Sequence, residues 1–278
     1  MNWFVVAGAC SSLLLAYLID TTNRRAFLLE VALERERQRS EALLRSILPA
    51  SIVERLKGDA VRVADLVEDA SVLFADIVGF TALARRLPPA QLIELLDRVF
   101  TDLDDIAARH GAEKIKTIGD AYMVAVGVAD AAGRDISALA ELALEARNAV
   151  WRTTARYGAP LQLRIGLCAG PVISGVIGRR KPHFDLWGDT VNTASRLESS
   201  GVAGEIQVDE HTYMRLRGAY EFEPRGTVEL KGIGPTTTYL LKRRRSPDPG
   251  RRDESDAPVA TPDRARPGRP LTHAATVQ

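Results

Sequence analysis

Two short stretches, FADIVGFT at 74–81 and KIKTIGDAYM at 114–123, decide how this chain is expected to fold. Each places one aspartate, Asp76 or Asp120, close to a glycine at the edge of an apolar run. The first stretch predicts a short strand over 70–76. The second predicts strands over 112–118 and 121–128, because the Gly-Asp pair between them suits a tight two-residue hairpin.

The stretches between and after these strands have helical periodicity. We expect helix over 80–109, broken at Pro88 and Pro89, then helix over 136–157 and strand over 161–169. This order, β-α-β-β-α-β, is the ferredoxin-like pattern of an α+β fold, in which the helices cover one face of an antiparallel sheet. Extra α/β elements follow it. The other face of the sheet then needs another cover, for which a second protomer is one candidate.

The N-terminal segment predicts a membrane helix at 1–22. The run from Trp3 to Ile19 holds 17 residues without a charge, and Arg24 and Arg25 follow it. Positive charge on that side predicts that the rest of the chain lies in the cytoplasm, at the cell membrane. A cleaved signal and a buried or interfacial helix are the alternatives.

Residues 23–50 predict a coiled-coil signalling helix, because a seam of positions recurs there at alternating steps of three and four. The seam is apolar at its two ends and polar in the middle, and it consists of Ala26, Leu29, Leu33, Glu36, Ser40, Leu43 and Ile47. A solvated spacer held by Glu/Arg pairs is the alternative interpretation. We expect a linker at 51–69, the main folded domain at 70–242 and a disordered, proline-rich tail at 243–278. The coiled coil indicates a homodimer.

Charge and cysteine content exclude some classes of function. The 37 basic and 36 acidic residues give a net charge of +1, so we expect no nucleic-acid partner. The two cysteines, Cys10 and Cys168, predict neither a disulfide framework nor a cysteine metal site.

The two aspartates predict a metal site. The strands that carry Asp76 and Asp120 are neighbours in the ferredoxin-like order, so the carboxylates are expected to face each other. Two ionised carboxylates repel unless a cation lies between them, and oxygen ligands suit a hard ion such as magnesium. For Asp120 alone, a turn residue is the competing interpretation.

Four motifs in order resemble the class III nucleotide cyclases over about 70–241, and the N-terminal segment resembles part of a mycobacterial-type membrane adenylate cyclase. The motifs are FADIVGFT, KIKTIGDAYM, FDLWGDTVNTASRLE at 184–198 and VELKGIG at 228–234. The resemblance implies two Mg²⁺ or Mn²⁺ ions per site, held by Asp76, Ile77 and Asp120 against the nucleotide phosphates. It also implies attack of the ribose 3′-hydroxyl on the α-phosphorus.

Asn192 and Arg196 are four residues apart on a predicted helix, so they share one face of it. An arginine fork aimed at phosphate oxygens stabilises the charge that develops in a transition state. The resemblance implies that role for Arg196 and orientation of the ribose for Asn192.

Lys116 and Asp185 form a donor and acceptor pair that complements adenine, and the resemblance associates this pair with ATP rather than GTP. It also implies that Lys231 meets the terminal phosphates. Because the family divides metal and base recognition between two protomers, the resemblance implies a head-to-tail homodimer.

The sequence therefore predicts an adenylate cyclase that converts ATP to 3′,5′-cyclic AMP and pyrophosphate. A guanylate cyclase and a non-catalytic nucleotide-binding dimerisation module are the alternatives.

Overall fold

The computed structural model of the 278-residue chain describes residues 3–45, 47–57, 64–128, 135–155, 161–178 and 180–246. The tail predicted at 243–278 lies outside the described residues beyond Ser246. The compact unit that contains the predicted site ends at Arg244.

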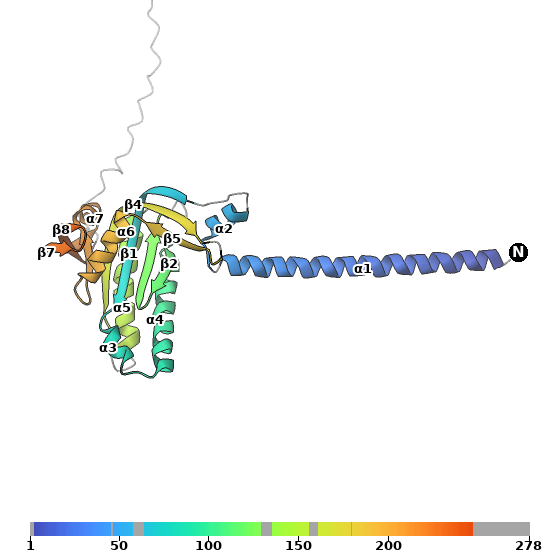
Figure 1. Ribbon diagram of the computed structural model, residues 1–278, viewed down its shortest axis with the longest axis horizontal. Helices are drawn as coiled ribbons and strands as arrows, with labels where there is room; N and C mark the ends of the chain where they lie inside the picture. Colours follow the sequence, from blue (N-terminus) through green and yellow to red (C-terminus); the bar gives the residue numbers. More distant parts are fainter. Residues whose placement is uncertain are drawn as a thin grey trace, which may run out of the picture. The chain divides into compact units, whose positions relative to one another are not determined.

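A single eight-stranded sheet forms the centre of the fold (Figure 1). Its strands are β1 (Ala64–Ile77), β2 (Glu113–Ile118), β3 (Ala121–Val126), β4 (Leu163–Ile177), β5 (His183–Trp187), β6 (Ile206–Asp209), β7 (Tyr220–Leu230) and β8 (Gly234–Arg244). The order is β2-β3-β1-β4-β6-β8-β7, with β5 paired to β4. Neighbouring strands are antiparallel except for the parallel pair β4 and β6. The prediction of an α+β fold is confirmed.

The described helices are α1 (Trp3–Arg45), α2 (Ala50–Lys57), α3 (Phe80–Ala84), α4 (Pro89–Arg109), α5 (Ile136–Ala155), α6 (Asp189–Ser199) and α7 (Glu210–Leu216). The predicted break near Pro88 is present, because α3 ends at Ala84 and α4 begins at Pro89. Proline is tolerated at a helix start, where its missing N–H would have no partner within the helix. Along the chain, β1 to β4 with their intervening helices follow the predicted order.

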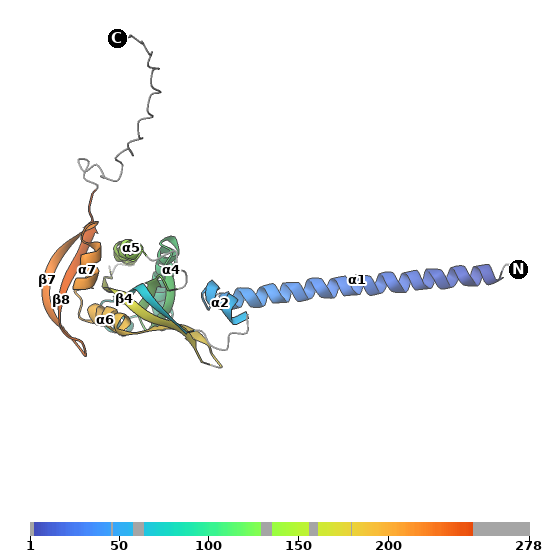
Figure 2. The same cartoon turned by 90° about the horizontal axis from the view of Figure 1, so that it is seen from above.

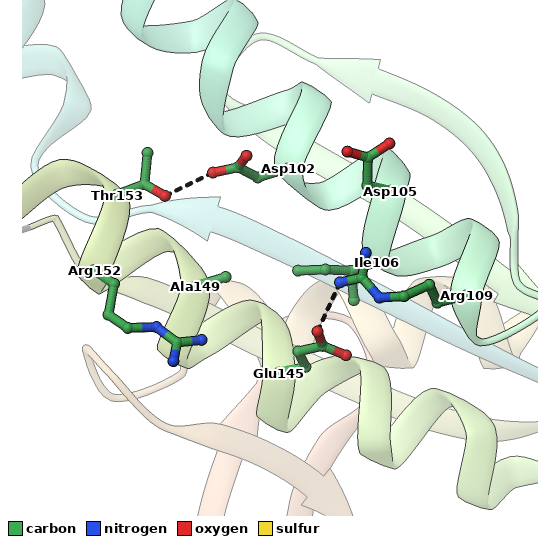
Figure 3. A pocket seen from close by; sticks show the side chains of 8 residues that line it. All are labelled: Asp102, Asp105, Ile106, Arg109, Glu145, Ala149, Arg152 and Thr153. Carbon is green, nitrogen blue, oxygen red and sulfur yellow. Dashed lines mark hydrogen bonds and ion pairs between the residues drawn. The ribbon is translucent and has the colours of Figure 1, made fainter.

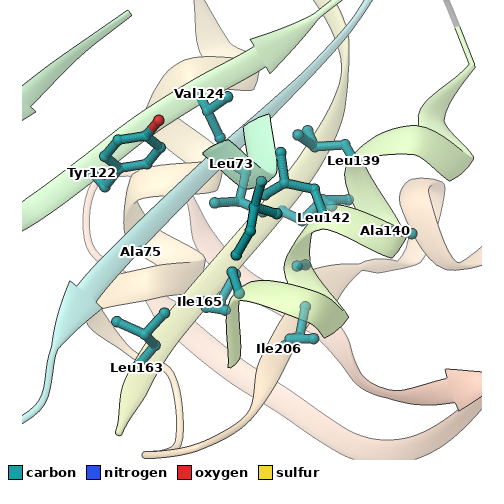
Figure 4. Packing of buried hydrophobic residues seen from close by; sticks show 14 of the residues in the cluster. Leu73, Ala75, Tyr122, Val124, Leu139, Ala140, Leu142, Leu163, Ile165 and Ile206 are labelled. Carbon is teal, nitrogen blue, oxygen red and sulfur yellow. The ribbon is translucent and has the colours of Figure 1, made fainter. Parts of the chain in front are cut away.

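Two apolar cores lie on opposite faces of the sheet. In the helix-side core, β1 contributes Leu73, Ala75 and Ile77, which pack with side chains of α4 and α5. Figure 4 shows part of this packing, and Figure 2 shows α4 and α5 side by side. Alternate β1 residues such as Val72 and Phe74 enter the far-side core, with side chains of α2, β5 and α6. Alternation along a strand directs successive side chains to opposite faces.

The segment predicted as a linker at 51–69 is structured where the chain is described. Helix α2 occupies its first part, and β1 begins at Ala64 rather than at 70. Ile52 and Val53 of α2, each 2% exposed, pack in the far-side core. The chain itself therefore covers part of the face for which the sequence offered a second protomer.

The N-terminal segment is one helix, α1, without a boundary between the two segments predicted at 1–22 and 23–50. Among the residues that the structure describes, no helix is long and apolar enough to cross a membrane. The predictions of a membrane helix and of a membrane location are therefore not confirmed. Leucines of the predicted coiled-coil seam point to solvent in the single chain, with Leu29 71% and Leu33 72% exposed.

Candidate functional site

The structure brings Asp76 and Asp120 together. Asp76 is the penultimate residue of β1, and Asp120 lies with Gly119 in the two-residue β2–β3 turn, where Gly119 has a φ of 66°. Ala75 of β1 pairs with Tyr122 of β3, so the turn that carries Asp120 lies beside the end of β1. Glycine suits this turn because side chains disfavour positive φ.

The pKa of Asp76 reflects both its burial and the acidic groups beside it. Burial, the charges of Asp120 and Glu198 and a hydrogen bond with Asp120 together raise this pKa to about 6, although the charge of Arg164 opposes the shift. A carboxyl group that resists ionisation beside other carboxylates lies in uncompensated negative potential. The arrangement favours a bound cation.

Arg164 and Glu198 belong to this site although the sequence analysis did not single them out. Arg164 lies on β4 directly opposite Asp76. Its Nη2 donates to Asp76 Oδ2 at 2.9 Å and its Nε donates to Glu198 Oε1 at 3.0 Å. The available signal was an arginine within the apolar strand sequence LQLRIGL. This signal does not identify the partners of the arginine, because they lie on β1 and α6, far away in the sequence.

The donor set fits a magnesium-type ion that also binds substrate. Within the described part of the chain, no group of three or more His, Cys, Asp or Glu side chains could hold a metal alone. Magnesium usually takes one or two carboxylates and completes its shell with water and substrate phosphates, so Asp76 and Asp120 suffice. The side chain of Ile77 is buried in the helix-side core, which leaves only its backbone for an ion.

Lys116 and Asp185 form an ion pair. Lys116 Nζ donates to Asp185 Oδ2 at 2.5 Å, across from β2 to β5. Asp185 is 6% exposed, and its other oxygen accepts a hydrogen bond from the backbone N–H of Leu186. The two residues predicted to read the base therefore lie in contact within one chain, 69 positions apart in the sequence.

Asn192 and Arg196 share the exposed face of α6, while Ala194 and Leu197 are buried on the opposite face. Among the described residues, neither exposed side chain has a hydrogen-bond or ion-pair partner. The helix approaches β4 closely because Gly166 lacks a side chain: a Cβ there would lie 2.2 Å from the backbone nitrogen of Glu198. This contact fixes the helix that carries both residues.

Lys231 is exposed in the turn between β7 and β8. Across the described ranges it makes no hydrogen bond or ion pair with another predicted site residue. The structure thus brings Asp76 close to Asp120 and, separately, brings Lys116 into contact with Asp185. It leaves Asn192, Arg196 and Lys231 facing solvent.

A groove of about 390 Å³ lies elsewhere, between α4 and α5 (Figure 3). Its polar side chains largely pair with one another: Arg109 Nη2 lies 2.6 Å from Glu145 Oε1, and Thr153 Oγ1 donates to Asp102 Oδ2 at 2.7 Å. None of the predicted site residues lines it, so it is separate from the candidate site.

Comparison with known families gives one match that spans most of the compact unit. The profile of the adenylate and guanylate cyclase catalytic domain matches residues 63–243. An adenylate cyclase from Mycobacterium tuberculosis is 46% identical over 223 residues, which is 80% of this chain and 50% of the relative. The chain therefore spans about half the length of this curated relative.

Solved structures agree with this match. The guanylate cyclase domain of RhGC from Catenaria anguillulae, in complex with GTP, is 35% identical and superimposes with a TM-score of 0.63. The similarity covers 65% of this chain and 100% of that one. The adenylyl cyclase CyaB from P. aeruginosa is 29% identical, with a TM-score of 0.62 over 66% of this chain and 97% of its own.

Proposed function

Because the chain belongs to the family of adenylate and guanylate cyclase catalytic domains, we propose that it is an adenylate cyclase. It converts ATP to 3′,5′-cyclic AMP and pyrophosphate. The observation that carries the choice of ATP is the contact between Lys116 and Asp185. Adenine presents an acceptor at ring N1 and a donor at its exocyclic amine, which this pair complements, whereas guanine reverses both groups.

Asp76 and Asp120 would hold two Mg²⁺ or Mn²⁺ ions, with the backbone of Ile77. Bound metal of this kind activates the ribose 3′-hydroxyl and neutralises charge on the phosphates. The raised pKa of Asp76 supports this assignment, because a bound cation would offset the two causes of the shift, which are burial and repulsion from Asp120 and Glu198. Arg164, between Asp76 and Glu198, partly compensates these carboxylates in the protein without substrate.

Arg196 would stabilise the negative charge that develops on the phosphate oxygens as the new bond forms, because a guanidinium offers several fixed donors. Asn192, one turn earlier on the same exposed face of α6, would orient the ribose. Lys231, exposed between β7 and β8, would bind the terminal phosphates.

We also propose a head-to-tail homodimer with two equivalent sites. Asp120 and Lys116 lie on one hairpin, yet metal and base recognition belong to different protomers in the arrangement that the family resemblance implies. The unpartnered side chains of Asn192 and Arg196, and the exposed leucines of α1, support a second copy of the chain. The isolated monomer should be inactive.

The decisive experiment uses the full chain, with ATP or GTP and with Mg²⁺ or Mn²⁺, across a range of protein concentrations. We expect cyclic AMP, with specific activity that rises with concentration because the sites are shared. Equal turnover of GTP would favour a guanylate cyclase, a class to which one relative bound to GTP belongs. No cyclic product from a folded dimer would indicate a non-catalytic nucleotide-binding module.

Asp76→Ala tests the metal assignment. Cyclic AMP production should be lost while the dimer is retained, because the substitution removes one of the two carboxylates that face the metal position. Unchanged production would contradict the assignment. The matched control is Asp69→Ala, on the same strand but paired with Arg215, which should leave turnover unchanged.

A further inference from the structure

Strand β2 contains a one-residue irregularity between its two lysines. Lys114 pairs with Val124 of β3, whereas Lys116 pairs with Met123, so Ile115 is an extra residue in β2. A β-bulge of this kind shifts the alternation of side chains and is often found where a strand must re-aim one of them.

The bulge sends the two lysines to opposite faces of the sheet. Directly opposed residues of antiparallel strands place their side chains on the same face. Val124 belongs to the helix-side core and Met123 to the far-side core. Without the bulge, Lys114 and Lys116 are two apart and would share one face.

Each lysine has a different acidic partner. Lys114 Nζ donates to Asp104 Oδ2 of α4 at 2.7 Å, and Lys116 Nζ donates to Asp185 Oδ2 at 2.5 Å. The second oxygen of Asp104 accepts from the hydroxyl of Tyr122 at 2.7 Å. We call Asp104, Lys114 and Tyr122 the Asp104 clamp.

The Asp104 clamp joins α4 to both strands of the hairpin, on either side of the bulge. Tyr122 is 1% exposed, its ring stacks on Phe100 of α4 at 6.1 Å, and Lys114 Nζ lies 5.4 Å from its centroid. Burial and the hydrogen bond to Asp104 raise the pKa of Tyr122, so its hydroxyl stays a donor. The buried tyrosine therefore fixes one end of the clamp in the core, whereas both ends of an ordinary surface ion pair are exposed.

We propose that the Asp104 clamp is a positioning device for base selection. By holding Lys114 and Tyr122 to α4, it keeps Ile115 in the bulge and thereby aims Lys116 at the adenine edge. None of its three residues touches the base. The inference rests on the proposed cyclase function for its meaning, but its test can be read from nucleotide binding alone.

The test compares Asp104→Ala with Asp69→Ala in the full chain. The two aspartates are matched, because each has a 43% exposed side chain in a salt bridge, Asp69 with Arg215. The readouts are the affinities for ATP and GTP and, where product forms, the ratio of kcat/KM for the two. Asp104→Ala should reduce the preference for ATP about tenfold, since small displacements of a positioning group have effects of that size or larger. Asp69→Ala should not change it.

Two Lys114 variants separate positioning from folding. Lys114→Met leaves the Tyr122–Asp104 hydrogen bond in place and should also weaken the preference for ATP. Lys114→Arg keeps the charge and should restore most of it. An unchanged ATP preference in both Asp104→Ala and Lys114→Met overturns the inference.

Binding also separates this inference from the proposed function. Wild-type protein that prefers ATP but forms no cyclic product would contradict the cyclase proposal alone. Wild-type protein that binds both nucleotides equally would overturn the inference itself, because Lys116 would then have no selectivity for the clamp to position.

Discussion

The two faces of strand β1 differ in what they do at the end of the strand. On the helix-side face, Leu73, Ala75 and Ile77 are all buried in one apolar core. On the other face, Val72 and Phe74 are buried, but the next residue in the alternation is Asp76, beside Arg164 and Asp120. The helix-side face is apolar up to the last residue of β1, whereas the other face ends in a charged residue. The difference teaches that stability and chemistry are divided between the faces, which substitutions can test.

The largest expected effect is on the helix-side face. Leu139 of α5 is fully buried in that core, so Leu139→Ala should lower the free energy of unfolding by about 2–5 kcal/mol through lost burial and a cavity. Urea or thermal unfolding measures it. Activity per folded molecule should be unchanged, because no site residue lies on α5. The control is Ile93→Ala on α4, where the isoleucine is 65% exposed; it should lower the free energy of unfolding by less than about 0.5 kcal/mol.

Arg196→Ala should show the opposite behaviour. It should lower kcat about 100- to 1,000-fold, because it removes a donor to charge that develops in the transition state. The melting temperature should stay the same, since the side chain is exposed and unpartnered among the described residues. Steady-state kinetics measures kcat, and thermal unfolding measures the melting temperature. Arg217→Ala, also exposed, should change neither, and a stability loss without a kinetic effect at Arg196 would contradict the division of roles.

Gly166→Ala should affect both stability and activity, because it lies where α6 packs against β4. The new Cβ would lie 2.2 Å from the nitrogen of Glu198 and 2.4 Å from the carbonyl oxygen of Ala194, so the helix must move. Overpacking of this kind costs about 1–3 kcal/mol. The melting temperature, measured by thermal unfolding, and kcat should both decrease.

Gly218→Ala is the matched control for Gly166→Ala, since no atom lies within 4 Å of a Cβ at Gly218. It should leave both quantities unchanged. If Gly166→Ala keeps wild-type turnover, the position of α6 does not control Arg196 and Asn192.

The smallest effect concerns pH. The folded-state pKa of Asp76 is raised from about 3.8 to about 6, so the folded chain holds this proton more tightly than the unfolded chain. The contribution of the protonated Asp76 to the free energy of unfolding is therefore lost as the pH rises from about 4 to about 6. Asp76→Asn does not titrate, so its stability relative to wild type should improve by on the order of 1 kcal/mol between pH 4 and pH 7.

Thermal unfolding without divalent cations, from pH 4 to pH 8, measures this difference. Added Mg²⁺ should stabilise the wild type above pH 6 and not the variant, because a cation favours the ionised pair. Parallel pH profiles for the two proteins would show that folding does not raise the pKa of Asp76.

Much of the fold could be predicted because its signals are local. The Gly-Asp hairpin, the proline break before α4 and the alternation along β1 each depend on residues close in sequence. Within the segment predicted as a linker at 51–69, the sequence did not indicate α2 or the first residues of β1, because these are explained only by the residues they pack against or pair with. Those partners are the far-side core and strand β4.

The membrane helix was predicted from a run without charges, and the described residues do not confirm it. Arg164 and Glu198 were missed for a different reason. A charged residue in an apolar strand indicates that a partner exists but not which one, and here the partners come from β1 and α6.

By itself, the sequence determined the family and the α+β class, because motifs and short-range periodicity are written in consecutive positions. Only the tertiary structure decided that Arg164 lies between Asp76 and Glu198, that Lys116 reaches Asp185, and that a bulge at Ile115 separates two lysines. These facts depend on strand register and on the packing of helices against the sheet. Both are set by contacts between residues far apart in the chain, which no local pattern records.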